Sequence, residues 1–295
     1  MKALFITTQT NDTHNHVDAW DSAFEPAKRI YFNYRGGLGN DAYILNKARA
    51  AGDVEVIFYI GSHNGDGIPS FETLREIRKI APLINIISDA ADDPWHKPIA
   101  TYRREECFDL QVGIDGDPQS PVDHVTLTPV DGRIFDSVMV EKDINCGLSG
   151  NVSGKRENIL TGVGSRCLIR LRGDDYLDHV RFMKRCKMIL NVAYTGSGHR
   201  YHIKGRVTEA GYAGACLLEF MQSPIKHWFP AYSYLGFKDV EHLKEVIDTV
   251  TPDMIRDCAE SFSKIVREKY SAAMIYGGIL EKLKNVADSN TPATA

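Results

Sequence analysis

The sequence predicts an α/β protein made of two doubly wound halves, each with a parallel sheet between layers of helices. Short apolar runs such as residues 2–8 (KALFITT) and 54–61 (VEVIFYIG) are typical of strands buried on both faces. Helical patterns alternate with these runs, and the alternation restarts after residues 129–136. The chain has 295 residues, 43% of them hydrophobic, and this length suits about two domains.

In the first half, the helix over residues 70–82 is predicted to begin after an N-cap serine, Ser70, and to end at Pro82. Another helical region is predicted from Trp20 to Tyr31. Because residues 34–41 (YRGGLGND) then follow a helix, we interpret them as a turn between helices and not as a phosphate loop. The remaining helix is expected over residues 41–52, and the strands over residues 2–8, 54–61, 84–89, 108–115 and 124–129.

The second half repeats the alternation of strands and helices. Its strands are expected over residues 145–150, 166–173, 187–193 and 215–220, and its helices over residues 156–163, 176–186, 239–250, 252–270 and 271–286, with a further helix starting near residue 204. We therefore expect a first domain over residues 1–137, a second domain over residues 138–275, and a C-terminal helix with a flexible tail over residues 276–295.

Composition excludes some classes of function and places the protein in the cytoplasm. The net charge of −4 gives no general attraction to nucleic acid or anionic membranes. No apolar run reaches the roughly 20 residues of a membrane span. The cysteines show no CxxC or other metal-ligand spacing, so we interpret them as reduced core residues and expect no metal site. They are Cys107, Cys146, Cys167, Cys186, Cys216 and Cys258.

The segment GLSGNVSGKRENIL, residues 147–160, has the form of an anion-binding loop. A strand ends at Ser149, Gly150 and Asn151, and a helix begins near Lys155 or Arg156. Glycine lets backbone N–H groups approach a ligand, and a helix N-terminus attracts negative charge. Neither the Walker sequence nor GxGxxG is present, so a plain strand-to-helix turn with solvated cations stays open.

A second cluster of charge occurs in YHIKGRVTEAGYAG, residues 201–214. Lys204, Gly205 and Arg206 stand at the start of a predicted helix, and Glu209 lies about one turn inside it. Cations at a helix N-terminus are unfavourable unless an anion is bound there. An acid at this position can accept hydrogen bonds from the vicinal hydroxyls of a nucleotide ribose. The alternative is that Glu209 merely complements the helix dipole.

These segments, together with residues 190–219 (LNVAYTGSGHRYHIKGRVTEAGYAGACLLE) and 237–247 (FKDVEHLKEVI), resemble the C-terminal domain of GT-B-fold glycosyltransferases. The closest likeness is to the CgeB-like, spore-maturation-type group, and it covers residues 123–270. The resemblance implies two Rossmann-like domains facing a cleft, and a nucleotide-diphospho-sugar donor used without metal or other cofactor. In many retaining relatives an additional acid precedes the donor helix, at the position of Tyr201, so the stereochemical outcome stays open.

The resemblance also implies roles for individual residues. Glu209 would bind the ribose hydroxyls of the donor. The phosphates would face the first-cluster residues Ser149, Gly150, Asn151 and Arg156 and the helix-start residues Lys204, Gly205 and Arg206. The nucleotide base would lie at the loop that contains Gly173 and Asp174.

The acceptor side requires a base for the acceptor hydroxyl, if the enzyme inverts. Three polar loops at predicted strand ends offer candidates: residues 13–18, 61–67 and 88–97. We favour Asp89 and His63 as catalytic residues, although a solvated loop side chain is the alternative for each.

The sequence therefore predicts a hexosyltransferase that uses a nucleotide sugar and an unidentified hydroxyl acceptor, which could be a glycan, a small molecule, a protein or a modified nucleic acid. Three alternatives stay open. The first is a DNA-base (hydroxymethyl-pyrimidine) glycosyltransferase, which would need a basic cleft and base flipping. The others are a sugar-nucleotide epimerase and a non-catalytic nucleotide-sugar-binding protein. The basic stretch at residues 170–187 is interpreted as a solvated face with donor contacts rather than as a nucleic-acid surface.

Overall fold

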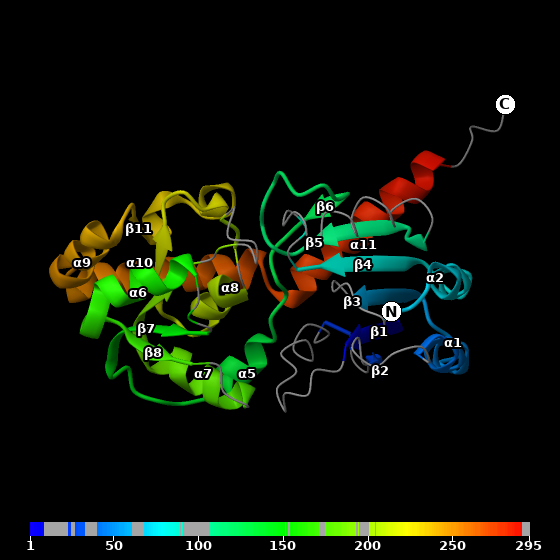
Figure 1. Cartoon of the computed structure of the whole chain (residues 1–295), viewed down its shortest axis with the longest axis horizontal. Helices are drawn as coiled ribbons and strands as arrows, with labels where there is room; N and C mark the ends of the chain where they lie inside the picture. The colour runs from blue at the N-terminus through cyan, green and yellow to red at the C-terminus, as the bar shows by residue number, and fades with distance from the viewer. Residues whose placement is uncertain are drawn as a thin grey trace.

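The computed structural model contains two parallel sheets that lie side by side along the long axis of the molecule (Figure 1). The predicted fold class, two Rossmann-like α/β halves, is confirmed. The structure describes residues 1–8, 23–24, 27–32, 40–60, 68–88, 90, 107–150, 152, 154–171, 175–192, 194, 201–203 and 205–290.

The first sheet has six parallel strands in the order β2-β1-β3-β4-β5-β6. All five residues of β3 and all five of β4 are buried, which explains their uninterrupted apolar sequences. The strands are β1 (Ala3–Thr8), β2 (Lys28–Phe32), β3 (Val56–Ile60), β4 (Leu83–Ile87), β5 (Leu110–Gly113) and β6 (His124–Val125).

Helices cover both faces of this sheet. Leu4 and Ile6 of β1 pack with α1 (Asn40–Ala50) and α2 (Phe71–Arg78), whereas Phe5 points to the opposite face because side chains alternate along a strand. The predicted cap of α2 is present, since the Ser70 hydroxyl accepts a hydrogen bond from the N–H of Thr73 at 3.2 Å.

The opposite face is covered by α11 (Ala272–Asn290), the last helix of the chain. This helix follows the second half in sequence but returns to lie along the first sheet (Figure 1). Its Tyr276 ring packs against Phe24 and Phe58, with ring centroids 4.9 and 5.0 Å apart. The two halves are therefore joined by a helix as well as by the segment between β6 and the second sheet.

The second sheet has five parallel strands in the order β11-β10-β9-β7-β8. The strands are β7 (Ile144–Ser149), β8 (Leu168–Arg170), β9 (Cys186–Asn191), β10 (Cys216–Phe220) and β11 (Leu235–Phe237). One core cluster joins this sheet to α6 (Lys155–Val163) and α9 (Val240–Thr249). The other joins it to α7 (Tyr176–Arg185), α8 (Gly205–Tyr212) and the second half of α10 (Pro252–Lys269).

The carboxyl ends of the two sheets face each other. The N–H of Ile203, in the connection after β9, donates to the Asp115 carbonyl at 2.7 Å, just beyond β5. The indole N–H of Trp228, after β10, donates to the Gly116 carbonyl at 2.7 Å. In open parallel sheets these ends are where ligands bind, so the fold directs both sets of ligand-binding loops toward one region.

The predicted helix from Trp20 to Tyr31 is wrong over its last four residues, 28–31, which belong to the edge strand β2 (Lys28–Phe32). Ile30 and Phe32 are buried and the first two residues are exposed, so the segment alternates as a half-buried strand does. Residues 34–41 consequently follow a strand, which removes our reason for interpreting them as a turn between helices. Residues 33–39 themselves lie outside the described residues. The short elements α5 (Gly132–Asp136) and β11 were not predicted.

All six cysteines are buried and free, as predicted. Within the described ranges, no helix is long and apolar enough to cross a membrane. The same residues contain no group of three or more His, Cys, Asp or Glu side chains that could hold a metal ion.

Replacing Tyr276 with alanine tests how α11 is held. Tyr276 is 1% exposed and contacts three phenylalanine rings, so the variant should lose about 3–5 kcal/mol of unfolding free energy in urea denaturation. Met274 lies on the same helix but is 56% exposed, and Met274→Ala should change the unfolding free energy by less than about 0.5 kcal/mol. Equal losses in the two variants would contradict the packing of α11 on the first sheet.

Candidate functional site

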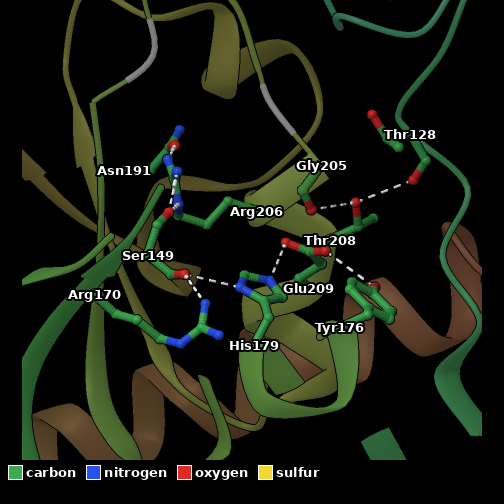
Figure 2. A network of polar contacts seen from close by, with 10 residues as sticks. All are labelled: Thr128, Ser149, Arg170, Tyr176, His179, Asn191, Gly205, Arg206, Thr208 and Glu209. Carbon is green, nitrogen blue, oxygen red and sulfur yellow. Dashed lines mark hydrogen bonds and ion pairs between the residues drawn. The ribbon is translucent and has the colours of Figure 1, made fainter. Parts of the chain in front are cut away.

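Arg206, in the first turn of α8, is the buried centre of the polar cluster in the second half (Figure 2). Its Nε donates to the Ser149 carbonyl at 2.9 Å, and its Nη1 donates to the Asn191 side-chain oxygen at 2.9 Å. Ser149 ends β7 and Asn191 ends β9. The guanidinium therefore fastens α8 to the carboxyl ends of two strands, a role that the sequence analysis did not foresee.

Gly150 leaves space for this guanidinium. Its φ of 138° is one that residues with a side chain rarely adopt, and a Cβ there would lie 2.5 Å from Arg206 Nη2. Its N–H donates to the Arg170 carbonyl at 3.0 Å, within the extension of the sheet. Gly150 is thus required for close approach, but this N–H is engaged by the protein and does not face a ligand as expected.

A second guanidinium lies close by. Arg156, on the first turn of α6, donates from Nε to the Val192 carbonyl at 2.9 Å. Burial lowers the pKa of Arg206 to about 10, and the charge of Arg156 acts in the same direction. Burial also lowers the pKa of Arg156. Two cations brought together next to Gly150 repel each other, and a bound anion would relieve that repulsion.

Glu209 lies one turn further along α8 and is held from both sides (Figure 2). Its Oε1 accepts a hydrogen bond from the Tyr176 hydroxyl at 3.0 Å, and its Oε2 lies 3.0 Å from His179 Nε2. The other ring nitrogen of His179 lies 2.9 Å from the Ser149 hydroxyl, to which Arg170 Nη1 donates at 3.4 Å. The carboxylate is therefore the end of a polar chain that starts at strand β8.

The same contacts decide the charge of Glu209. Burial alone would raise its pKa, but the charge and hydrogen bond of His179, the Tyr176 hydroxyl and the charge of Arg206 together lower it to about 2. Glu209 is consequently an ionised carboxylate near neutral pH, and an ionised carboxylate only accepts hydrogen bonds. Its two oxygens are fixed by these contacts, and its side chain as a whole retains 13% exposure.

A second acid, Glu219 on β10, is fully buried behind this cluster. Its Oε2 accepts from the Asn191 amide at 2.7 Å, and the same amide group accepts from Arg206. Burial raises the pKa of Glu219 to about 8, although hydrogen bonds from Asn191 and Ser223 oppose the rise. We did not single out Glu219 from the sequence. The sequence could have indicated this buried acid, because Glu219 is the one charged residue in the apolar run ACLLEF.

The structure places six of the proposed donor residues in one region and leaves the others outside its described residues. These six lie at the carboxyl end of β7 (Ser149 and Gly150), on the first turn of α6 (Arg156) and on the first two turns of α8 (Gly205, Arg206 and Glu209). Asn151, Lys204, Gly173, Asp174 and the proposed catalytic residues Asp89 and His63 are outside the described residues.

The sequence analysis missed Tyr176, His179 and Asn191 as partners in the site. Tyr176 and His179 are three residues apart in α7, on one face of the helix, and they follow directly on the loop assigned to the nucleotide base. That spacing was visible in the sequence, but nothing local linked it to Glu209.

Known proteins are similar to this chain in part of its sequence and in its fold. Residues 148–281 match the family model described as glycosyl transferase-like. HepE of Anabaena, solved in complex with UDP-glucose, is 11% identical with a TM-score of 0.65, over 97% of this chain and 100% of that chain. A glycosyltransferase from Rickettsia africae is 10% identical with a TM-score of 0.61, over 98% of this chain and 100% of that chain. No curated protein matches the chain.

A third solved structure is AviGT4, a glycosyltransferase involved in avilamycin A biosynthesis. It is 9% identical with a TM-score of 0.58, over 98% of this chain and 99% of that chain. Similarity at these identities concerns the fold, and it extends over both halves. The chain therefore has the GT-B fold, and residues 148–281 are similar to the glycosyl transferase-like family model.

The buried proton on Glu219 should appear in the pH dependence of stability. Its ordinary pKa of 4.5 rises to about 8 in the folded protein, so between these values the folded state binds the extra proton. The contribution of Glu219 to unfolding free energy therefore falls as the pH rises through this window. Glu219→Gln keeps the shape and removes the titration, so the variant should gain stability relative to the original protein between about pH 5 and pH 8. Urea denaturation at several pH values measures the difference.

Glu260→Gln serves as the control for this titration, because Glu260 is an exposed residue of α10. The unfolding free energy of the Glu260→Gln variant should follow that of the original protein across the same pH range. If the Glu219→Gln curve also runs parallel to the original, Glu219 does not hold a proton in the folded state.

Proposed function

We propose that the protein is a glycosyltransferase that moves a hexosyl group from a nucleotide-diphospho-sugar to a hydroxyl acceptor. The observation that carries the proposal is the fixed, ionised Glu209 beside the buried Arg206 and the half-buried Arg156, at the carboxyl edge of the second sheet. All three residues fall within the segment that matches the glycosyl transferase-like family model. A carboxylate can accept hydrogen bonds from the hydroxyls of a ribose, and the two neighbouring cations can bind the diphosphate linked to that ribose.

In this proposal Glu209 accepts hydrogen bonds from the ribose hydroxyls. Arg156 and Arg206, with Lys204, Asn151 and the amino ends of α6 and α8, neutralise the diphosphate. The same positive charge stabilises the diphosphate as it leaves, so the proposal requires no metal ion. The base of the nucleotide lies at Gly173 and Asp174, in the loop that leads into α7.

HepE is solved with UDP and with UDP-glucose, so UDP-glucose is the first donor to test.

We keep Asp89 and His63 as the proposed base for the acceptor hydroxyl, in loops that follow β4 and β3. The CgeB-like likeness of residues 123–270 is the basis for proposing that subgroup. Six buried free cysteines are consistent with a reducing compartment, which supports the proposed cytoplasmic location.

The donor site is tested by ligand-induced thermal shift with UDP, GDP, ADP, CDP and dTDP, with and without sugars. At about 100 times the dissociation constant, the preferred diphosphate should stabilise the protein by ~2.7 kcal/mol. Glu209→Gln should bind it about tenfold or more weakly, since a hydrogen bond to a charged group is lost. It should also lose any preference for the ribonucleotide over its deoxy form.

Glu241→Gln is the matched control for Glu209→Gln, because Glu241 lies in the same half with its side chain 81% exposed. Its nucleotide affinity should equal that of the original protein. A Glu209→Gln protein with unchanged affinity would show that the ribose is bound elsewhere. If none of the nucleotides or nucleotide sugars raises the melting temperature, the glycosyltransferase proposal itself is contradicted.

Gly150→Ala tests the cation pair independently of Glu209. The added Cβ would displace Arg206, so nucleotide affinity should fall by about tenfold or more. Gly164→Ala is the control, because Gly164 lies at the opposite end of α6 and also has a positive φ, but a Cβ there meets no atom within 4 Å. The two variants share the backbone strain, and only Gly150→Ala disturbs the guanidinium. Equal affinities for UDP in both variants would contradict the assigned role of Arg206.

A further inference from the structure

A pocket of about 400 Å³ lies between the two halves, apart from the residues of the donor cluster. One wall is residues 117–119, in the loop after β5 of the first sheet. The other wall comes from the second half: Tyr201, before α8, and Gln222, Ser223, Pro224, Lys226 and His227, after β10. Its volume falls within the range of small-molecule sites.

The first wall is held in a definite shape by a buried acid. Asp115 Oδ1 accepts hydrogen bonds from the N–H of Asp117 at 3.2 Å and from the Ser120 hydroxyl at 3.1 Å. Asp117 in turn accepts from the N–H of Gln119 at 3.0 Å and is only 4% exposed. This Asx-type turn fixes the shape of residues 117–119, so Asp117 supports the wall from within while the Gln119 side chain is exposed.

The two walls are also fastened to each other. The Trp228 indole donates to the Gly116 carbonyl at 2.7 Å, and the N–H of Ile203 donates to the Asp115 carbonyl at 2.7 Å. Ile203 lies two residues before α8, the helix that contains Glu209. The pocket is therefore built from the segment that leads directly into the donor helix.

The lining has the chemistry of a carbohydrate site. Gln119 and Gln222 are exposed at the pocket, and each has a carboxamide that both donates and accepts hydrogen bonds. Lys226 and His227 add donors at the rim, where both are exposed. Tyr201, together with the prolines of both walls, provides apolar surface for the face of a ring. Several short polar groups around such surface suit a ligand with many hydroxyls on a ring.

We propose that this pocket binds the sugar ring of the acceptor, with Gln119 and Gln222 as hydrogen-bonding residues for its hydroxyls. The inference rests on the proposed glycosyltransferase function and names the acceptor class as a glycoside. The pocket lies between the two halves, on the side where the carboxyl ends of both sheets face each other. A transfer reaction requires the donor and the acceptor to meet in this region.

Saturation-transfer NMR tests this site with methyl glycosides of glucose, galactose, mannose and N-acetylglucosamine, each added in the presence of UDP. At least one glycoside should give a signal with the original protein. Gln119→Ala keeps the backbone N–H that donates to Asp117 but truncates an exposed side chain of the first wall, and Gln222→Ala does the same on the second wall. Each should weaken glycoside binding by about tenfold or more while UDP affinity stays unchanged.

Asp53→Asn is the control, because Asp53 is 91% exposed in the first half and far from the pocket lining. It should bind the glycoside as the original protein does. If UDP binds but no glycoside does, or if both pocket variants bind the glycoside normally, the acceptor assignment is overturned and the donor site stands. If UDP-glucose displaces the glycoside where UDP does not, the pocket holds the donor sugar instead. Failure of all nucleotides to bind would contradict the glycosyltransferase proposal separately.

Discussion

The buried guanidinium of Arg206 is the interaction on which the arrangement of the second half depends. Removing a cation from water costs several kcal/mol unless hydrogen bonds replace its hydration. Arg206 meets that requirement with the Ser149 carbonyl and the Asn191 amide, which belong to two different strands. The start of α8 is consequently locked to the ends of β7 and β9. Glycine is required at position 150 for the same reason, since any side chain there would occupy the space of the guanidinium.

The charges around Arg206 also explain why the two acids behave differently. Glu209 is surrounded by donors and a neighbouring cation and is ionised, with a pKa of about 2. Glu219 lies deeper, and burial raises its pKa to about 8. Near neutral pH the cluster therefore has two guanidinium charges and one carboxylate charge from these four residues. A net positive region at converging helix starts is suited to an anion such as a diphosphate.

Much of the fold was predictable because burial leaves a regular mark on local sequence. Strands β3 and β4, buried at every position, appear as continuous apolar runs, and the Ser70 cap of α2 was visible as a residue type at a helix start. The edge strand β2 was missed because its first two residues are cationic and exposed and only two of its five are buried. That single error changed the interpretation of the glycine-rich segment after it.

The sequence by itself determined the fold class, the free cysteines and the two segments that contain the proposed donor residues, because these depend on local periodicity and residue type. Only the tertiary structure showed that Tyr176 and His179 hold Glu209 across 30 or more residues of chain, and that Asp117 and Gln222 line one pocket. Such contacts depend on strand order, on which strand ends meet, and on the return of α11 to the first sheet. None of these is encoded in the spacing of neighbouring residues, because each results from the packing of whole elements.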